Sequence, residues 1–468
     1  MTAAPHMHAL RAVPIVKRLV SLTAALTAVA ALAAVAHTIT RADPIDPTSA
    51  VATATAALGF LLMGGWLAGR LASGVGLPAL TGQLLAGICA GPSVAAALAQ
   101  PAAAWGWVDI PTIVSEQDIR YLAGIDALAV AMIGIAAGGE LELHHLRRIA
   151  RRVLSIMVLE MPAVGLAAGG ALAVSIATGL AALGPDVPVT LACTLTGCLM
   201  MASSPAVAIA LTREHGRAGE FARFAMALIV AKDIVLTVLF TGVLVAGATV
   251  FGTGGGSGGG TAAPQAVTVL AWHLVGSLAL GAVLAAPLAL VLRRIERRLD
   301  MVALVVAALV AAVSRALDLS PLLVALTLGM ALRTGAPSSS RSFFSATGRI
   351  LLPVCCIFFA LTGAKLDVES IVPVLPVTLA ICAARVLAAW AGATAGASLA
   401  GMELRTRRWI WACLVPQAGV AIALASEVGA AFKGTPWASP LTALLISCVA
   451  VNEIVGPPLM RLALRRAQ

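Results

Sequence analysis

Long apolar runs separated by short polar segments fill most of the sequence. A run of about 20 apolar residues is long enough to cross the hydrocarbon core of a bilayer as an α-helix. The runs predict about 13–14 transmembrane helices, over residues 19–38, 51–73, 78–98, 121–139, 153–180, 188–212, 222–251, 267–292, 301–317, 320–333, 350–364, 371–399, 409–428 and 439–462. No polar stretch between them is long enough for a soluble domain. The pattern therefore predicts an all-α polytopic membrane protein.

The composition agrees with a chain whose solvent is lipid. Of the 468 residues, 60% are hydrophobic and 11% are charged, whereas soluble globular proteins carry about 25% charged residues. The formal net charge is +10, but the basic residues lie in short clusters between apolar runs and form no stripe on a folded domain. Such clusters indicate membrane topology, so we expect a lipid bilayer as partner and no nucleic acid.

The distribution of Lys and Arg predicts the orientation. If the amino terminus is cytoplasmic, the inside segments hold 24 of the 31 basic residues, and the outside segments hold Arg41, Arg120, Lys365 and Lys433. Cytoplasmic loops carry an excess of Lys and Arg. We therefore expect a multi-pass protein of the bacterial inner membrane with a cytoplasmic carboxyl terminus.

Two segments permit more than one interpretation. The first apolar run, with Ala-Val-Ala at 34–36, fits either a cleaved signal peptide or an uncleaved helix, and we favour the helix because about 18 apolar residues is long for a signal sequence. The glycine-rich run at 252–260 lacks the Lys-Ser/Thr ending of a phosphate-binding loop. It is better interpreted as a flexible extracytoplasmic linker.

Two sets of six helices carry the same motifs in the same order. Residues 138–143 and 363–368 end the third helix of each set, and residues 232–235 and 452–455 lie in the last helix of each. A single connecting helix gives the sets opposite orientations, and inverted repeats are typical of secondary transporters. We therefore divide the chain into an extra helix or signal peptide with its loop (1–50), a first six-helix repeat (51–251), a linker with a connecting helix (252–300) and a second, inverted six-helix repeat (301–468).

The fifth helix of each set is predicted to be broken. Small, polar and proline residues interrupt both apolar runs: Ser203, Ser204, Pro205, Pro416, Gln417 and Gly419. Proline removes a backbone donor, and freed backbone groups are tolerated in a membrane only where protein or water satisfies them. Two breaks at equivalent positions predict crossing half-helices beside an ion site.

Lys232 and Asp233 stand side by side in the apolar run 224–250. A charge at bilayer depth costs a few to more than ~10 kcal/mol, so intramembrane ionisable residues usually mark ion or proton pathways. The pair therefore predicts the site of ion transfer. The alternative is a mutually neutralised pair that only holds neighbouring helices together.

These residues resemble the monovalent cation:proton antiporters, in the branch that includes the potassium-efflux antiporters. The resemblance covers residues from about 51 to 462 and rests on short motifs in the family's order: GLPALTGQLLAG at 76–87, GGELEL at 138–143, SSPAV at 203–207, AKDIV at 231–235, FFALTG at 358–363 and PQAGVA at 416–421. It implies that Asp233 binds either the cation or the proton. Arg385 looks like the basic residue of the helix that faces this aspartate.

The resemblance also implies a homodimer and no cofactor. Because the chain stops at Gln468, we expect no regulatory nucleotide-binding domain. Ser203 stands where the family usually has Thr. The main departure is Lys232, since relatives carry Asp, Asn or Gln before the aspartate, and this leaves ion choice and charge stoichiometry open.

We expect the cation and the proton to compete for the Asp233 carboxylate, which can hold one monovalent cation (Na⁺ or K⁺) or one proton. This competition would couple the movement of the cation to that of the proton. We expect Ser203, Ser204 and Gln417 to add oxygen ligands. Glu160 and Arg385 occupy the fourth helix of their respective repeats, which predicts a buried ion pair between them. Lys232 is expected to pair with Asp233 or with Glu160, and a buried lysine can also carry a proton itself.

Other functions fit the sequence less well. A gated cation channel, an ion sensor on the same scaffold and a sodium-coupled organic anion symporter remain alternatives to the antiporter. We expect no enzyme, because Ser203 lacks a histidine base within the helices apart from His273 near an outer end. We expect no bound metal beyond the transported cation: the eight cysteines show no metal or disulfide spacing, and His144 and His145 do not face each other.

Overall fold

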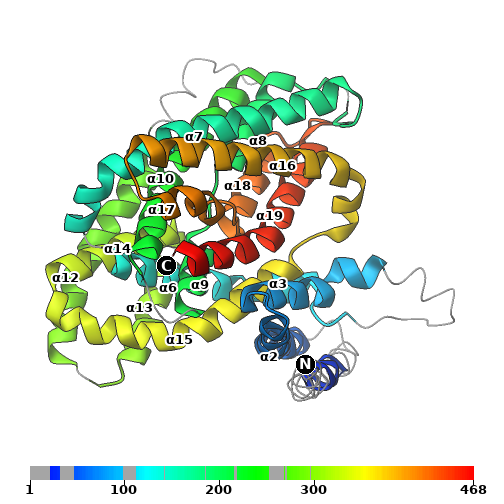
Figure 1. Ribbon diagram of the computed structural model, residues 1–468. Helices are drawn as coiled ribbons and strands as arrows, with labels where there is room; N and C mark the ends of the chain where they lie inside the picture. Colours follow the sequence, from blue (N-terminus) through cyan, green and yellow to red (C-terminus); the bar gives the residue numbers. More distant parts are fainter. Residues whose placement is uncertain are drawn as a thin grey trace, which may run out of the picture. The chain divides into compact units, whose positions relative to one another are not determined.

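The computed structural model describes residues 22–31, 47–97, 112–141, 143–184, 186–214, 219–251, 268, 271–295 and 297–467. Within these ranges the chain is helical and contains no strand (Figure 1). Ten of the described helices are long and apolar enough to cross a membrane, and shorter apolar helices lie at Leu22–Ala31, Ala79–Ala90, Pro321–Gly335 and Gly419–Ala431. These helices correspond one by one to the apolar runs, so the prediction of an all-α, multi-pass membrane protein is confirmed.

The chain forms two compact units. The first unit runs to Asp126 and includes Pro353–Glu369. It contains α2 (Pro47–Gly74), α3 (Ala79–Ala90), α5 (Glu116–Tyr121), the start of α6 (Ala123–Glu140) and the end of α15 (Pro337–Ala364). Its core gathers buried apolar residues of α2, α3 and α15, among them Phe60 and Leu361, together with Leu122 between α5 and α6. At its edge, Lys365 Nζ and Asp126 Oδ2 form an ion pair at 2.7 Å.

The second unit contains the rest of the described chain, Ala127–Leu352 and Ser370–Gln468. Besides the remaining parts of α6 and α15, its helices are α7 (Leu143–Ala177), α8 (Val189–Met200), α9 (Pro205–Glu214), α10 (Glu220–Phe251), the π-helix η1 (Trp272–Gly276), α12 (Ser277–Arg294), α13 (Leu299–Ala316), α14 (Pro321–Gly335), α16 (Val368–Leu399), α17 (Leu404–Trp409), the 3₁₀-helix η2 (Ile410–Cys413), α18 (Gly419–Ala431) and α19 (Ala438–Ala467).

Glycines let α7 approach two other helices of the second unit closely. A Cβ at Gly392 or Gly396 of α16 would lie 2.7 Å from the Cα of Glu160 and 2.6 Å from the Cα of Ile156, both in α7. On another side of α7, a Cβ at Gly169 would lie 2.7 Å from the Cys193 carbonyl oxygen of α8. Small residues four apart are the usual means by which helices associate in lipid. They hold α7 between α16 and α8, with Glu160 on the side of α7 that faces α16.

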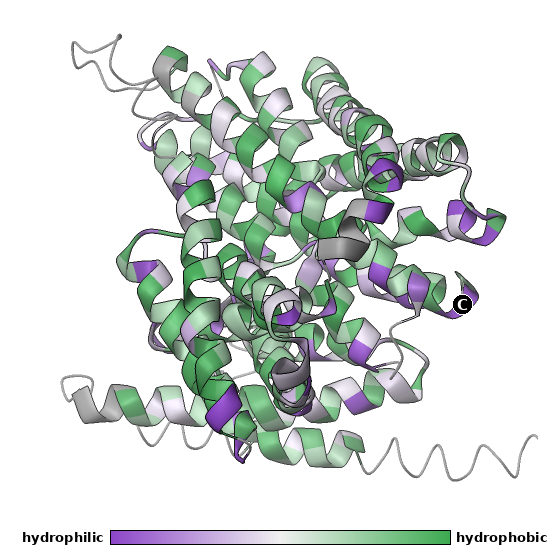
Figure 2. Ribbon diagram, turned by 90° about the vertical axis from the view of Figure 1, so that its left-hand side faces the viewer, coloured by the Kyte–Doolittle hydropathy of each residue, from purple (hydrophilic) through white to green (hydrophobic). Residues whose placement is uncertain are grey.

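The outer faces of the helices are apolar. Leu166 in α7 and Leu399 in α16 are 79% and 77% exposed, and hydrophobic residues colour most of the helical surface in Figure 2. Lipid tails cover such surface without the cost of hydrating it. The exposed apolar side chains therefore agree with a bilayer around the helices.

Some predictions fall outside the described residues. These are the Ala-Val-Ala segment at 34–36 and the glycine-rich run at 252–260, and the side chains of His144 and His145 are likewise not described. The inverted relation of the two six-helix sets, and the division of the chain based on it, remain predictions.

Candidate functional site: two broken helices joined by buried charges

The first break separates α8 from α9. Helix α8 ends at Met200 and α9 begins at Pro205. Proline suits the first position of a helix, where its missing N–H would have no intrahelical partner. Ser204 precedes it and caps α9, because its Oγ accepts a hydrogen bond from the Val207 backbone N–H at 3.2 Å. The interruption therefore lies at the residues from which it was predicted.

The second break separates η2 from α18. The chain leaves helical geometry after Cys413 and resumes it at Gly419. Pro416 lies in this non-helical segment and packs tightly on α19, where a Cβ at Gly456 would overlap the Pro416 backbone. A larger residue at 456 would push the segment away, so the glycine helps to hold the break in place.

The two breaks touch each other through hydrogen bonds. The Ser204 N–H donates to the Pro416 carbonyl oxygen at 2.8 Å, and Ser203 Oγ donates to the Leu414 carbonyl oxygen at 2.8 Å. Gln417 Nε2 donates to the Leu199 carbonyl oxygen at 3.0 Å. Backbone groups that lost their helical partners in one break are thus satisfied by the other. The second unit contains a direct crossing of two interrupted helices.

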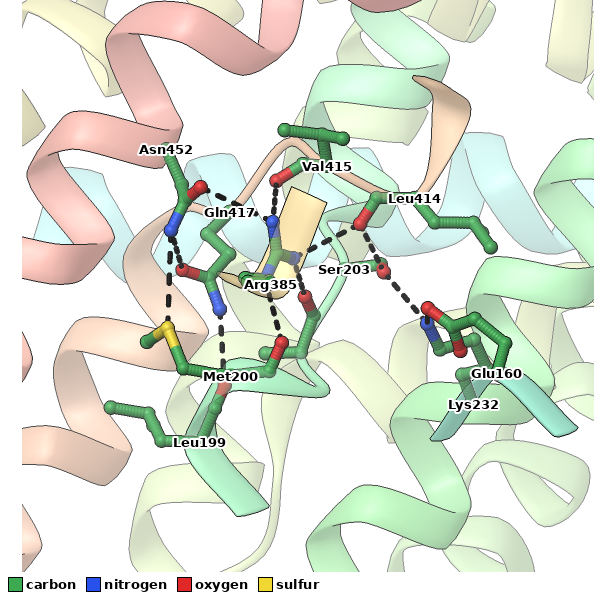
Figure 3. A network of polar contacts seen from close by, with 11 residues as sticks. Glu160, Leu199, Met200, Ser203, Lys232, Arg385, Leu414, Val415, Gln417 and Asn452 are labelled. Atoms are coloured by element: carbon green, nitrogen blue, oxygen red, sulfur yellow. Dashed lines mark hydrogen bonds and ion pairs between the residues drawn. The ribbon is translucent and has the colours of Figure 1, made fainter. Parts of the chain in front are cut away.

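Arg385 of α16 donates hydrogen bonds to four backbone carbonyl oxygens at the crossing (Figure 3). Its five N–H groups each have an acceptor: Nε donates to Met200 O at 2.6 Å, Nη1 to Val415 O at 2.7 Å and Asn452 Oδ1 at 3.2 Å, and Nη2 to Ala202 O at 2.7 Å and Leu414 O at 3.0 Å. These carbonyls lie at the carboxyl ends of α8 and η2, where a helix carries partial negative charge. Arg385 is 2% exposed, so backbone dipoles and one amide take the place of water around its guanidinium.

Asn452 of α19 extends this network. Its Oδ1 accepts from Arg385, and its Nδ2 donates to Gln417 Oε1 at 3.1 Å and to the Cys448 carbonyl oxygen at 2.8 Å. Asn452 is 2% exposed. It therefore connects the guanidinium, the second break and its own helix in one buried set of hydrogen bonds.

Lys232 of α10 pairs with Glu160 of α7. The Lys232 Nζ lies 2.6 Å from Glu160 Oε1, and the two side chains are 1% and 2% exposed. The same ammonium donates to Ser203 Oγ at 3.3 Å, which links the ion pair to the first break (Figure 3). The predicted pair between Glu160 and Arg385 is wrong. Glu160 pairs with Lys232 instead, and Arg385 donates four N–H groups to carbonyl oxygens of the crossing and one to Asn452 of α19.

Asp233 follows Lys232 on α10 but takes no part in this network. Adjacent residues on a helix do not face each other, so the lysine that reaches α7 points away from its neighbour's carboxylate. Asp233 is 6% exposed. Its own backbone carbonyl accepts from Thr237 at 2.9 Å, but no described residue donates a hydrogen bond to its carboxylate or forms an ion pair with it. The carboxylate is therefore available to a cation or a proton.

The structure brings most predicted site residues together, but their hydrogen bonds are to other protein groups and differ from the cation contacts that we expected. Ser203, Ser204 and Gln417 lie at the crossing. The side chains of Ser203 and Gln417 join the breaks to each other and to Lys232 and Asn452, whereas the Ser204 side chain caps α9. Sequence reasoning did not include Asn452 among the site residues. The signal was present, because residues 452–455 match residues 232–235 in the repeat pattern and a buried Asn needs several polar partners.

A crossing of broken helices that holds buried charges inside an apolar helical bundle is the architecture of a secondary ion transporter. The family model for the transmembrane region of sodium/hydrogen exchangers matches residues 57–461. The chain therefore belongs to the sodium/hydrogen exchanger family, which is a family of transporters rather than enzymes. This confirms the resemblance to the monovalent cation:proton antiporters.

The fold has a solved counterpart. The sodium proton antiporter MjNhaP1 from Methanocaldococcus jannaschii, solved at pH 8, is similar with a TM-score of 0.61 and 16% sequence identity, over 89% of this chain and 99% of that chain. At this identity the similarity supports the shared fold. A search of curated proteins finds no match to the sequence.

Proposed function

We propose that this protein exchanges a monovalent cation, Na⁺ or K⁺, for protons by alternating access, and that the two compete at Asp233. Family membership supports the exchange of a cation for protons. The observation that carries the assignment of the site is the state of Asp233, which is a buried carboxylate with no hydrogen bond or ion pair from a described residue. Its sequence neighbour Lys232 reaches the crossing through Ser203.

Competition at a single carboxylate explains how cation transport is coupled to proton transport without any further mechanism. A carboxylate provides oxygen ligands for a hard cation, and protonation removes the charge that attracts the cation. With neither a cation nor a proton bound, the Asp233 carboxylate would be an unpaired charge at bilayer depth, which is costly. The loaded forms therefore cross between the two sides more readily than the empty one, and this difference enforces exchange.

The charges around the site favour electroneutral exchange. Lys232 and Glu160 cancel each other at 2.6 Å, so Asp233 is the group whose occupancy changes. Replacement of one proton by one monovalent cation on Asp233 leaves the charge of the loaded carrier unchanged. If Lys232 also released its proton during the cycle, a second proton would move and the exchange would carry net charge.

The experiment is proton flux in proteoliposomes with an internal pH dye, driven in turn by Na⁺, K⁺ and Li⁺ gradients. Asp233→Asn keeps the size of the side chain and removes its charge, and we expect it to abolish cation-driven proton flux. Asp318→Asn is the matched control: Asp318 is exposed and has a φ of 54°, a conformation that Asn also accepts. Undiminished flux in Asp233→Asn would contradict the proposal, and conductance without proton movement would indicate a channel.

Stoichiometry is tested with the same vesicles. A membrane potential, imposed by a potassium gradient and valinomycin during Na⁺-driven exchange, should leave the rate unchanged. A current that follows the Na⁺ gradient would contradict electroneutral exchange and would assign a mobile proton to Lys232.

A further inference from the structure

Arginines from two helices of the second unit meet at one tryptophan. The guanidinium carbons of Arg408 and Arg466 lie 5.9 and 5.6 Å from the centroid of the Trp409 ring. Arg408 and Trp409 belong to α17, and Arg466 lies in the last turn of α19, which packs against α17. A guanidinium within about 6 Å of a ring centroid is attracted by the ring. Trp409 therefore gathers positive groups from two separate helices.

The arginines at this place have no acidic partner in the described chain. Arg408, Arg465 and Arg466 are exposed. No described carboxylate forms an ion pair with any of them, including that of Glu403, which directly precedes α17. Like charges that are held close together repel each other. An anion from outside the chain that touched both helices would remove this repulsion.

Exposed leucines adjoin the arginines on both helices. Leu404 precedes Arg408 by four residues, and Leu462 precedes Arg466 by four, so each leucine shares a helix face with its arginine. Both leucines are exposed. Because α19 is long and apolar enough to span the membrane and Arg466 lies in its last turn, Leu462 lies nearer to the bilayer interior than Arg466. Tryptophan is enriched at the membrane–water interface. The patch therefore offers apolar contact, an aromatic ring and positive charge, which are what the acyl chains, the interface and the phosphate of a phospholipid require.

We propose that Arg408, Arg466 and Trp409 bind the phosphate headgroup of an anionic phospholipid, whose acyl chains cover Leu404 and Leu462. A guanidinium matches the geometry of phosphate and donates two parallel hydrogen bonds to it. A headgroup with net negative charge is favoured, because a choline or ethanolamine headgroup would bring its own ammonium beside the guanidiniums. The site lies on the side of the membrane that is predicted to be cytoplasmic, where basic pockets between helices bind anionic headgroups.

The end of α12 provides a comparison. Arg293 and Arg294 are exposed in the last turn of α12, and no described aromatic ring lies against either. This pair carries the same charge as Arg408 and Arg466, but on a single helix. If charge alone attracted the lipid, both pairs would contribute equally. A site built from two helices requires that only Arg408 and Arg466 matter.

The bound lipid would connect segments that lead to the crossing. Helix η2 begins at Ile410, directly after α17, and the second break follows η2. Helix α19 packs against both α17 and η2. A headgroup held by α17 and α19 would therefore fasten the outer end of this segment to α19. We expect the lipid to raise the unfolding temperature of the protein.

The test counts bound lipid directly. The delipidated chain in a neutral detergent is mixed with equal amounts of dioleoyl-phosphatidylglycerol and dioleoyl-phosphatidylcholine, which differ only in the headgroup, and retained lipids are counted by native mass spectrometry. The unmodified chain should retain phosphatidylglycerol at least several-fold in excess. The double variant Arg408→Gln/Arg466→Gln should retain one phosphatidylglycerol molecule fewer per chain. Arg408→Lys/Arg466→Lys keeps the charge but loses the paired hydrogen bonds, so it should hold this lipid several-fold more weakly.

Arg293→Gln/Arg294→Gln is the matched control, because it removes the same charge and should leave the count unchanged. An equal loss in the two glutamine double variants, or no loss in Arg408→Gln/Arg466→Gln, would overturn the proposal. A large excess of inorganic phosphate should not displace the lipid; displacement would assign the site to free phosphate instead.

Thermal unfolding without lipid shows whether each variant is folded, and Arg466→Gln alone replaces the double variant if that variant is not. Added phosphatidylglycerol should raise the unfolding temperature of the unmodified chain more than that of Arg408→Gln/Arg466→Gln, and an equal rise would contradict the proposal. Since binding is counted without transport, an absence of cation/proton exchange would leave these results interpretable.

Discussion

Replacing either member of the Lys232–Glu160 pair with Met should destabilise the protein by about 3–5 kcal/mol, because it leaves the other charge buried without a partner. The two side chains are 1% and 2% exposed and 2.6 Å apart. In Glu160→Met, the ammonium keeps only the Ser203 hydroxyl at 3.3 Å. In Lys232→Met, no described side chain remains to donate to Glu160, whose Oε2 already lacks a hydrogen bond.

Neutralisation sets an upper limit to each loss. At pH 7 it costs about 5 kcal/mol to remove the proton from an ordinary lysine and about 4 kcal/mol to add one to an ordinary glutamate. A buried group that loses its partner does not lose more than this, since it changes protonation instead. The double variant with Met at both positions buries no charge. It should lie within about 2 kcal/mol of the unmodified protein, because well-packed apolar side chains replace buried ion pairs at little cost.

The assay is thermal unfolding in detergent of the unmodified protein, the two single variants and the double variant. For a chain of 468 residues, 1 kcal/mol corresponds to about 1 °C in Tm. Each single variant should lose about 3–5 °C and the double variant about 2 °C or less. A double variant that loses the sum of the two single losses would refute the reasoning, since the side chains would then act independently. The double variant should also retain Asp233-dependent exchange, which would exclude Lys232 as a proton carrier.

Three further outcomes follow from the geometry. Arg385→Lys offers three donors in place of five and leaves buried carbonyl oxygens unsatisfied, so it should cost about 2–4 kcal/mol in thermal unfolding and slow proteoliposome exchange. Gly138→Ala should lower the free energy of unfolding by about 1–3 kcal/mol, because the added Cβ would overlap the Leu326 carbonyl oxygen. The control is Gly170→Ala, whose Cβ meets open space. There the better helix propensity of alanine should raise the unfolding temperature. Arg213→Gln breaks an ion pair with Glu140 whose side chains are 30% and 27% exposed, and it should cost less than about 1 kcal/mol. A larger loss would indicate a structural role for the pair.

The features that the sequence predicts well are those with a local cause. Bilayer thickness sets the length of each apolar run, and this fixes the number and order of the helices. Pro205 and Pro416 interrupt their helices through the geometry of their own rings, so the breaks could be placed within a few residues. The choice of Lys232 and Asp233 as candidate site residues follows from the cost of charge in lipid, whatever their partners are, and both are buried.

The partners could not be predicted in the same way. Whether Glu160 meets Lys232 or Arg385 depends on how α7, α10 and α16 are rotated about their axes, and close contacts at Gly392 and Gly396 fix part of that arrangement. The ligands of Arg385 are mainly carbonyl oxygens that become free only when two helices break at the same place. Backbone acceptors of this kind have no residue identity, so the sequence carries no direct sign of them.

The unusual lysine has a physical explanation in these contacts. A lysine directly before a buried aspartate would be expected to neutralise it, yet successive residues on a helix point in different directions. Lys232 turns to Glu160 and leaves Asp233 without a described partner. The pairing with Glu160 therefore keeps the Lys232 ammonium away from the Asp233 carboxylate, although the two residues are adjacent on α10. If that is its role, removing Glu160 alone should slow exchange more than removing both members of the pair, because the unpaired ammonium would then be free to turn to Asp233. Equal rates in Glu160→Met and in the double variant would contradict this account.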